Sequence, residues 1–262
     1  MILPLLALAT AAAAPAAAYQ SSPERRTVAP RTFNHWIAGY RAQLLPSMER
    51  DFGEKYLYAP ANAALPPPRP GERRVVFLGD SITDKWDLAR FFPGRPYVNR
   101  GIGGQVTAQM VLRFHQDVIA LRPKAVVILA GINDLTDVLQ EETDAGIKAN
   151  WEAMAEMAQA HGIAVVFGSI MPVNNYTDNA RDMLKDRDPR RIVLLDAWLR
   201  AFCARHGFQY ADYFAAMVDG RGLLQADLTR DGLHPVAAGY AKMAPIVQAA
   251  ITRALATAPA GR

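Results

Sequence analysis

The chain has 262 residues, 51% of them hydrophobic and 21% charged, which suits one large globular domain or two small ones with a sizeable buried core. The formal net charge of +4 comes mostly from scattered arginines, with no long basic run and no basic stripe interleaved with aromatic side chains. This distribution argues against nucleic acid as a partner.

The first segment, MILPLLALATAAAAPAAAYQ, carries no charged side chain and contains a short apolar core typical of a secretory signal peptide. It is too short and too rich in alanine for a membrane span. Ala16-Ala17-Ala18 fits the small-x-small cleavage pattern, so we expect a signal peptide over residues 1–18 and a periplasmic or secreted protein without stable membrane insertion. No Lys or Arg precedes the apolar run, which leaves an uncleaved anchor as the alternative.

Residues 19–72 are predicted to form an N-terminal extension. It contains one helix-like stretch, NHWIAGYRAQLLPSMERDF, and ends in the proline-rich linker LPPPRPGE, Leu65 to Glu72. The residues of this segment indicate no function for it.

After residue 73, apolar strand-like runs alternate with segments of helical spacing. The expected strands are 74–78, 97–98, 125–130, 163–169 and 208–210, and the expected helices lie within 106–121, 149–160 and 192–204. His161-Gly162 and His206-Gly207 mark two helix ends, where a histidine meets the negative end of the helix and a glycine adopts a left-handed cap. We therefore predict a three-layer α/β/α domain over residues 73–262, with a central parallel sheet of about five strands.

Polar, glycine-rich turns follow the expected strands. They are GDS (Gly79 to Ser81), NRGIGGQ (Asn99 to Gln105) and AGIND (Ala130 to Asp134), and a fourth cluster, TRDGLHP (Thr229 to Pro235), precedes the last helix. Because sites in such sheets form beyond the carboxyl ends of the strands, we expect these four clusters to converge on one rim.

The four clusters contain the groups that acyl transfer requires. Ser81 offers a hydroxyl, His234 a base, and Asp231, three residues earlier, a carboxylate that orients the imidazole. The backbone N–H groups of Ser81 and Gly104 and the side-chain amide of Asn133 are neutral donors for an oxyanion hole. The predicted catalytic residues are Ser81, Asp231 and His234, and the predicted oxyanion donors are Ser81, Gly104 and Asn133.

Each of these residues also has a structural interpretation. Ser81 and Asn133 could each cap a helix, the glycines at 103 and 104 could form only a tight turn, and His234 could be a polar residue before a helix. The catalytic interpretation is favoured because four independent explanations would otherwise coincide at the strand ends that one mechanism requires. Ser81 does not lie in a G-x-S-x-G elbow, because Thr83 replaces the final glycine.

The remaining reactive side chains indicate no cofactor. His35 and His115 have no partner at metal-ligand spacing, and no phosphate-binding or dinucleotide-binding motif is present. Cys203, the single cysteine, is expected to be a small buried hydrophobic side chain. Trp86 is expected to pack in the core, with a wall of the acyl site as the alternative.

The segments FLGDSITD, GIGGQ, AGINDL and DGLHP resemble, in the same order, the four sequence blocks of the SGNH hydrolase superfamily, also called GDSL esterases and lipases. The resemblance covers roughly residues 73–254, and Ile82 replaces the leucine of the family name. It implies a flavodoxin-like fold, no metal or organic cofactor, Ser81 as the nucleophile, and the triad and oxyanion roles given above. The GIGG turn is similar to that of platelet-activating-factor acetylhydrolase subunits and single-domain bacterial esterases, which suggests small acyl groups.

Residues 171–189 form a polar segment that should border the site, with hydrophilic side chains at Asn174, Asn175, Asp178, Arg181, Asp182 and Lys185. We therefore expect a serine esterase acting on short acyl, most plausibly acetyl, esters of a hydrophilic alcohol such as a carbohydrate. The alternatives are a lysophospholipase or thioesterase acting on longer acyl chains and a non-catalytic carbohydrate-binding protein of the same fold. The segment could also be only a solvated surface loop.

Overall fold

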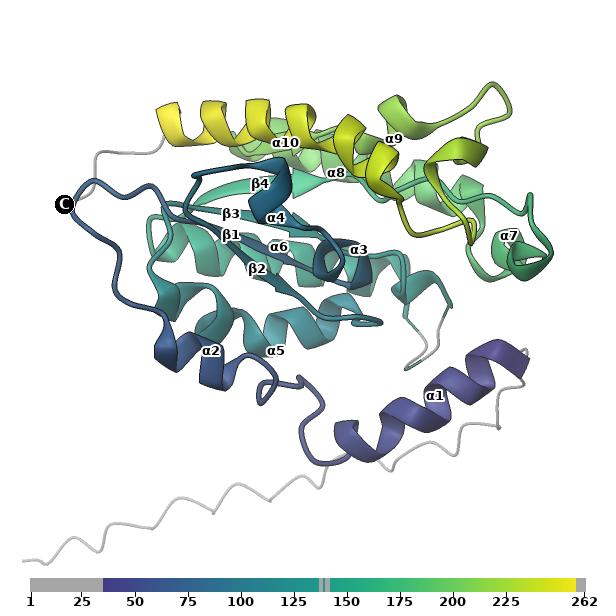
Figure 1. Ribbon diagram of the computed structural model, residues 1–262, viewed down its shortest axis with the longest axis horizontal. Helices are drawn as coiled ribbons and strands as arrows, with labels where there is room; N and C mark the ends of the chain where they lie inside the picture. Colours follow the sequence, from purple (N-terminus) through teal and green to yellow (C-terminus); the bar gives the residue numbers. More distant parts are fainter. Residues whose placement is uncertain (1–34, 137–138, 140–141, 258–262) are drawn as a thin grey trace, which may run out of the picture. The chain divides into compact units, whose positions relative to one another are not determined.

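The computed structural model describes residues 35–136, 139 and 142–257 (Figure 1). The predicted signal peptide and the first part of the predicted extension lie outside these residues, as does the side chain of His35.

The described residues contain a five-stranded parallel sheet with the strand order β2-β1-β3-β4-β5. Every residue of β1 and β3 is buried, because helices cover both faces of a parallel sheet. The strands are β1 (Val75–Gly79), β2 (Tyr97–Gly101), β3 (Ala125–Leu129), β4 (Ala164–Gly168) and β5 (Gln209–Ala211). The predicted fold class is confirmed, although β2 is longer than expected.

Helices form the two outer layers, as the predicted crossovers require (Figure 1). On one face α5 (Thr107–Asp117) packs beside α6 (Asp144–Ala160), which meets α8 (Pro189–His206) through Trp151 and Trp198, with ring centroids 6.1 Å apart. On the other face α4 (Leu88–Phe91) meets α10 (Ala237–Thr257) through Phe91 and Tyr240, with centroids 6.0 Å apart.

Shorter helices lie in the connections between the strands and between β5 and α10. They are α3 (Ser81–Asp84), α7 (Met183–Asp186), α9 (Tyr213–Met217) and the 3-10 turns η1 (Ile119–Leu121), η2 (Asp134–Thr136), η3 (Asp178–Ala180) and η4 (Ala226–Leu228). Two expected helix ends are confirmed: His161 caps α6, and α8 ends at His206 before Gly207, whose φ is 72°.

Two side chains singled out in the sequence lie in the core. Trp86 is 2% exposed and packs between Phe77 and Tyr240, with ring centroids 5.8 and 5.2 Å away, which confirms its expected packing role. Cys203 is also buried, and burial raises the pKa of its thiol to about 12, so the thiol stays protonated at neutral pH.

The described part of the extension contains α1 (His35–Met48) and α2 (Ala59–Ala64). Hydrogen bonds join the extension to the sheet and to α5. The Tyr58 hydroxyl donates to the Gly101 carbonyl at 2.6 Å, and the Asn62 amide donates to Asp117 at 2.6 Å. The extension thereby contacts the end of β2 and the end of α5.

Candidate active site

The turn that carries Ser81 lies where β1 ends and α3 begins. Asp80 is the N-cap of α3, because its side chain accepts a hydrogen bond from the Ile82 N–H at 2.9 Å. Ser81 is the first residue inside the helix, so the cap role considered for it belongs to Asp80. The Ser81 hydroxyl instead lies 2.8 Å from Nε2 of His234.

His234 is held by the carboxylate of Asp231, with 2.7 Å between Nδ1 and Oδ2. The other oxygen, Oδ1, accepts hydrogen bonds from the N–H groups of His234 at 2.8 Å and Leu233 at 3.1 Å. Burial raises the pKa of Asp231, but the hydrogen bonds from His234 and Leu233 outweigh that effect and hold it well below its usual range. Asp231 is therefore ionised at neutral pH.

The predicted oxyanion residues lie on the neighbouring strand ends. Gly104, in the turn after β2, has a φ of 79°, the left-handed region that glycine adopts without strain. Asn133, after β3, is 6% exposed, and its Nδ2 donates to the Gln105 carbonyl at 3.1 Å. This hydrogen bond joins two of the polar turns. The turn after β2 also lies close to Ser81, because a Cβ added to Gly103 would be 3.8 Å from the Cβ of Ser81.

The Asn133 side chain caps no helix. Its backbone carbonyl accepts from the N–H and hydroxyl of Thr136, whereas its amide faces the turn after β2. The next helix, α6, is capped by Thr143. The buried carboxylate of Asp134 instead supports the start of α5, where it accepts from the N–H of Thr107 at 3.1 Å and from the Thr107 hydroxyl at 2.6 Å. Burial raises the pKa of Asp134 to about 7, although the two Thr107 hydrogen bonds lower it.

Arg113 is a supporting residue that the sequence analysis did not single out. Its side chain is fully buried in α5 and donates to the Gly79 carbonyl at 3.0 Å, the Arg100 carbonyl at 2.8 Å and Oε1 of Gln105 at 2.6 Å. It also pairs with Asp117 at 3.1 Å. Arg113 therefore joins the ends of β1 and β2 to the turn that carries Gly104. The sequence feature that could have indicated its burial is its position, three residues after Met110 on the apolar stripe of this helix.

Asp80 is a second buried carboxylate beside the triad, and it is 1% exposed. Its Oδ2 has no hydrogen-bond partner in the described part of the chain. Burial raises the pKa of Asp80 to about 6, although the hydrogen bond from the Ile82 N–H and the electrostatic effects of the His234 imidazole and the Arg187 guanidinium lower it.

The polar segment after β4 does border the histidine turn. The Asn174 N–H donates to the Gly232 carbonyl at 2.9 Å, and the Asn174 side chain, 1% exposed, donates to the Leu224 carbonyl at 2.8 Å. The expectation that Asn174 faces the substrate is therefore wrong, because its amide is used to join two loops. Exposed polar side chains remain at Asn175, Asp178, Arg181, Asp182 and Lys185.

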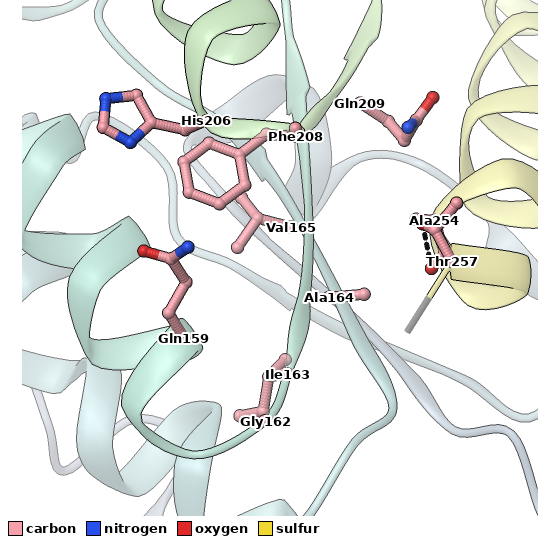
Figure 2. A pocket seen from close by; sticks show the side chains of 11 residues that line it. Gln159, Gly162, Ile163, Ala164, Val165, His206, Phe208, Gln209, Ala254 and Thr257 are labelled. Atoms are coloured by element: carbon pink, nitrogen blue, oxygen red, sulfur yellow. Dashed lines mark hydrogen bonds between the residues drawn. The ribbon is translucent and has the colours of Figure 1, made fainter. Parts of the chain in front are cut away.

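A pocket of about 260 Å³ lies at the opposite end of the sheet (Figure 2). Its lining includes Ala164 at the start of β4 and the ends of α8 and α10, at His206 and Thr257. None of the predicted site residues lines it, because those residues follow the carboxyl ends of the strands. Within the described ranges, no group of three or more His, Cys, Asp or Glu side chains could hold a metal ion.

A hydroxyl, an imidazole and a carboxylate in line at the carboxyl edge of a parallel α/β/α sheet define a class of proteins, the serine hydrolases. Residues 77–242 match the GDSL-like Lipase/Acylhydrolase family, and the chain belongs to this family of ester hydrolases. The predicted family membership is thereby confirmed.

Solved structures and a curated relative agree with this assignment. A GDSL-like lipase from Bacteroides thetaiotaomicron is 36% identical, with a TM-score of 0.72 over 78% of this chain and 100% of that one. The uncharacterised lipoprotein YqeF of Bacillus subtilis is 30% identical over 177 residues, 49% of this chain and 72% of YqeF. A catalytic mutant of an acetylxylan esterase from Geobacillus stearothermophilus, 19% identical, shares the fold with a TM-score of 0.54 over 68% of this chain and 94% of that one.

Proposed function

We propose that the protein is a serine esterase that hydrolyses carboxylic esters through an acyl-enzyme. The observation that carries the proposal is the continuous contact from Ser81 Oγ to His234 Nε2 at 2.8 Å and from His234 Nδ1 to Asp231 Oδ2 at 2.7 Å. In this arrangement the imidazole can accept the hydroxyl proton while the carboxylate stabilises the resulting imidazolium.

The reaction begins when Ser81 Oγ attacks the ester carbonyl and His234 Nε2 takes its proton. The N–H groups of Ser81 and Gly104 and the amide of Asn133 donate to the oxygen that becomes negative. His234 then protonates the leaving alcohol as the carbon–oxygen bond breaks, which leaves the acyl group on Ser81. A water molecule, deprotonated by His234, repeats the attack and releases the carboxylic acid.

The substrate is proposed to be a short acyl ester, most plausibly acetyl, of a hydrophilic alcohol such as a carbohydrate. The exposed polar side chains of residues 175–185 support this proposal, because they can hydrogen-bond hydroxyl groups near the histidine turn. A long acyl chain would instead need an apolar surface, since each buried methylene contributes about 0.8 kcal/mol to binding. The acetylxylan esterase that shares the fold is compatible with this substrate class.

The proposal is tested with a p-nitrophenyl ester series from acetyl to palmitoyl, run beside acetylated sugars. We expect kcat/KM to peak at two to four carbons, and a maximum at ten or more would favour the lysophospholipase or thioesterase alternative. A fluorophosphonate probe should label the protein once, and Ser81→Ala should abolish labelling with a loss of about 10³-fold or more in kcat. Absence of both turnover and labelling would favour the carbohydrate-binding alternative.

The protein is further proposed to act in the periplasm or outside the cell. The apolar N-terminal segment supports this location, and YqeF is a lipoprotein. No helix in the described residues has the length and hydropathy that a membrane span requires. After expression in a bacterium, intact mass should show loss of residues 1–18, whereas a chain that keeps Met1 and stays with the membrane pellet would indicate an anchor.

A further inference from the structure

Arg187, directly after α7, is a buried cation with no ion-pair partner among the described residues. Its side chain is among the most enclosed in the protein, at 3% exposed. Nη1 faces the Met183 sulfur at 3.3 Å, and Nε has no hydrogen-bond partner in the described ranges. None of the ion pairs found among the described residues includes Arg187.

Arg187 lies beside the catalytic triad. The charges that act on it are those of Asp186, Asp80 and Asp231 and the Tyr40 hydroxyl, and burial lowers the pKa of Arg187 to about 10, which leaves it positive at neutral pH. The segment that precedes it packs against the histidine turn: a Cβ on Gly232 would lie 2.8 Å from that of Ala180.

Tyr40 brings a hydroxyl from α1 to the same site. A Cβ on Gly104 would collide with the Tyr40 hydroxyl oxygen, so this oxygen contacts the turn that carries the proposed oxyanion donor. Packing of Met48 in α1 against Val106 and Leu139, and a hydrogen bond from Arg41 to the Leu139 carbonyl at 2.9 Å, hold α1 in place.

A guanidinium buried without a counterion is costly, because removing a charge from water costs several kcal/mol unless an opposite charge compensates. Two of the three nearby carboxylates already have other roles, since Asp231 binds His234 and Asp80 caps α3. The space around Ser81 is itself confined, because Ser81 is 9% exposed and Asn133 is 6% exposed. Arg187, at 3% exposed, is more enclosed than either of them.

We propose that Arg187, assisted by the Tyr40 hydroxyl, forms an anion subsite beside the triad that selects esters carrying a carboxylate close to the scissile bond. The inference rests on the proposed esterase function and adds a substrate class to it. A guanidinium matches a carboxylate geometrically, since its parallel N–H groups can donate to both oxygens. The carboxylate can belong to the acyl group or to the alcohol, for example an acetylated uronic acid.

Two pairs of substrates distinguish these sources. Methyl hydrogen succinate is compared with methyl butyrate for the acyl side, and acetylated glucuronic acid with acetylated glucose for the alcohol side, by pH-stat titration at neutral pH. We expect wild-type kcat/KM to favour the carboxylate member of one pair by about 10-fold or more, since a hydrogen bond to a charged group contributes about 1.5–3 kcal/mol. Equal rates within both pairs would overturn the inference.

Variants then test Arg187 itself. Arg187→Met should lower the ratio of kcat/KM for the carboxylate ester over its neutral partner by about 10- to 100-fold. Arg187→Lys should keep part of the ratio, and Tyr40→Phe should raise KM for the carboxylate ester. Arg190→Met, an exposed arginine at the start of α8, is the matched control and should keep the wild-type ratio.

A ratio that Arg187→Met leaves at the wild-type value would overturn the subsite, because Arg187 would then act on the triad rather than on substrate. If Arg187→Met fails to fold, as thermal unfolding would show, Arg187→Lys decides: a ratio equal to that of wild type contradicts the inference, and a reduced ratio supports it. Failure of the esterase proposal is distinguishable, since the wild-type protein would then hydrolyse neither member of any pair and would not react with a fluorophosphonate.

Discussion

Replacing Asp231 by asparagine tests the proposed catalytic role of the triad with little change in shape. In the structure Oδ1 accepts the N–H groups of Leu233 and His234, whereas Oδ2 contacts Nδ1 of the imidazole. An asparagine amide must place its oxygen toward the two N–H groups, because the NH₂ group cannot accept them. The NH₂ group therefore faces Nδ1 of His234.

The consequence is a change of tautomer. With an NH₂ donor in front of it, Nδ1 must accept, so the imidazole proton moves to Nε2, which then cannot take the proton of Ser81. We expect kcat to fall by about 10⁴, or about 5.5 kcal/mol of transition-state stabilisation. The melting temperature should fall, because the turn keeps both hydrogen bonds to the residue at position 231 but loses the negative charge that they stabilise.

The assay measures kcat on p-nitrophenyl acetate, the rate of fluorophosphonate labelling and the melting temperature. Asp227→Asn is the control, since Asp227 is exposed on η4 close to the same turn and should leave all three unchanged. If Asp231→Asn keeps kcat within tenfold of wild type, the carboxylate does not set the tautomer and the reasoning is refuted.

Four further changes probe the site and its surroundings. Asn133→Ala should lose about 10² to 10³ in kcat, as for one missing oxyanion donor, and an unchanged kcat would mean that Asn133 only ties two loops together. Gly104→Ala should cost about 1–2 kcal/mol of backbone strain and about 10²-fold or more in kcat, because its Cβ collides with Tyr40. Gly162→Ala is the control, because Gly162 has a φ of 66° but an added Cβ would meet no atom. It should lower the melting temperature through the same backbone strain and keep full activity. Asp196→Asn should flatten the pH dependence of stability measured by urea unfolding at pH 5 and 8. Burial raises the pKa of Asp196 to about 8, so the free energy of unfolding of the wild-type protein falls as pH rises from about 4 to 8; an equally steep fall in the variant would contradict this assignment.

The sheet could be predicted from the sequence because its strands are short apolar runs bounded by turns. β1 and β3 are buried on both faces, so their sequences are almost uniformly hydrophobic and their positions are correct to about one residue. β2 was predicted too short because Asn99 and Arg100 are polar. In the structure the Asn99 side chain donates to the carbonyls of Thr83 and Trp86, so polar residues extend the strand without being solvated.

The proposed catalytic residues could be located in advance because each stands in a short motif directly after a strand or before the last helix. The buried residues that support these side chains could not be located in advance. Arg113 is charged, and a charged residue on a helix ordinarily faces water. Its position on the apolar stripe indicates burial, but the helical period does not identify the four hydrogen-bonding partners that surround it in the interior. Arg187 escaped prediction for the same reason, since burial of a long polar side chain depends on contacts that are distant in sequence.

Gln105 shows why the extension matters to the proposed chemistry. Its Nε2 donates to Glu54 at 3.1 Å, its Oε1 accepts from Arg113 at 2.6 Å, and its backbone carbonyl accepts from Asn133 at 3.1 Å. The residue after Gly104 is thus held from the extension, from α5 and from the turn after β3. A donor aimed at a developing negative charge is most effective when it needs no rearrangement during the reaction. The extension therefore supplies part of the rigidity that an oxyanion donor at Gly104 requires, which neither the strands nor the four sequence blocks provide alone.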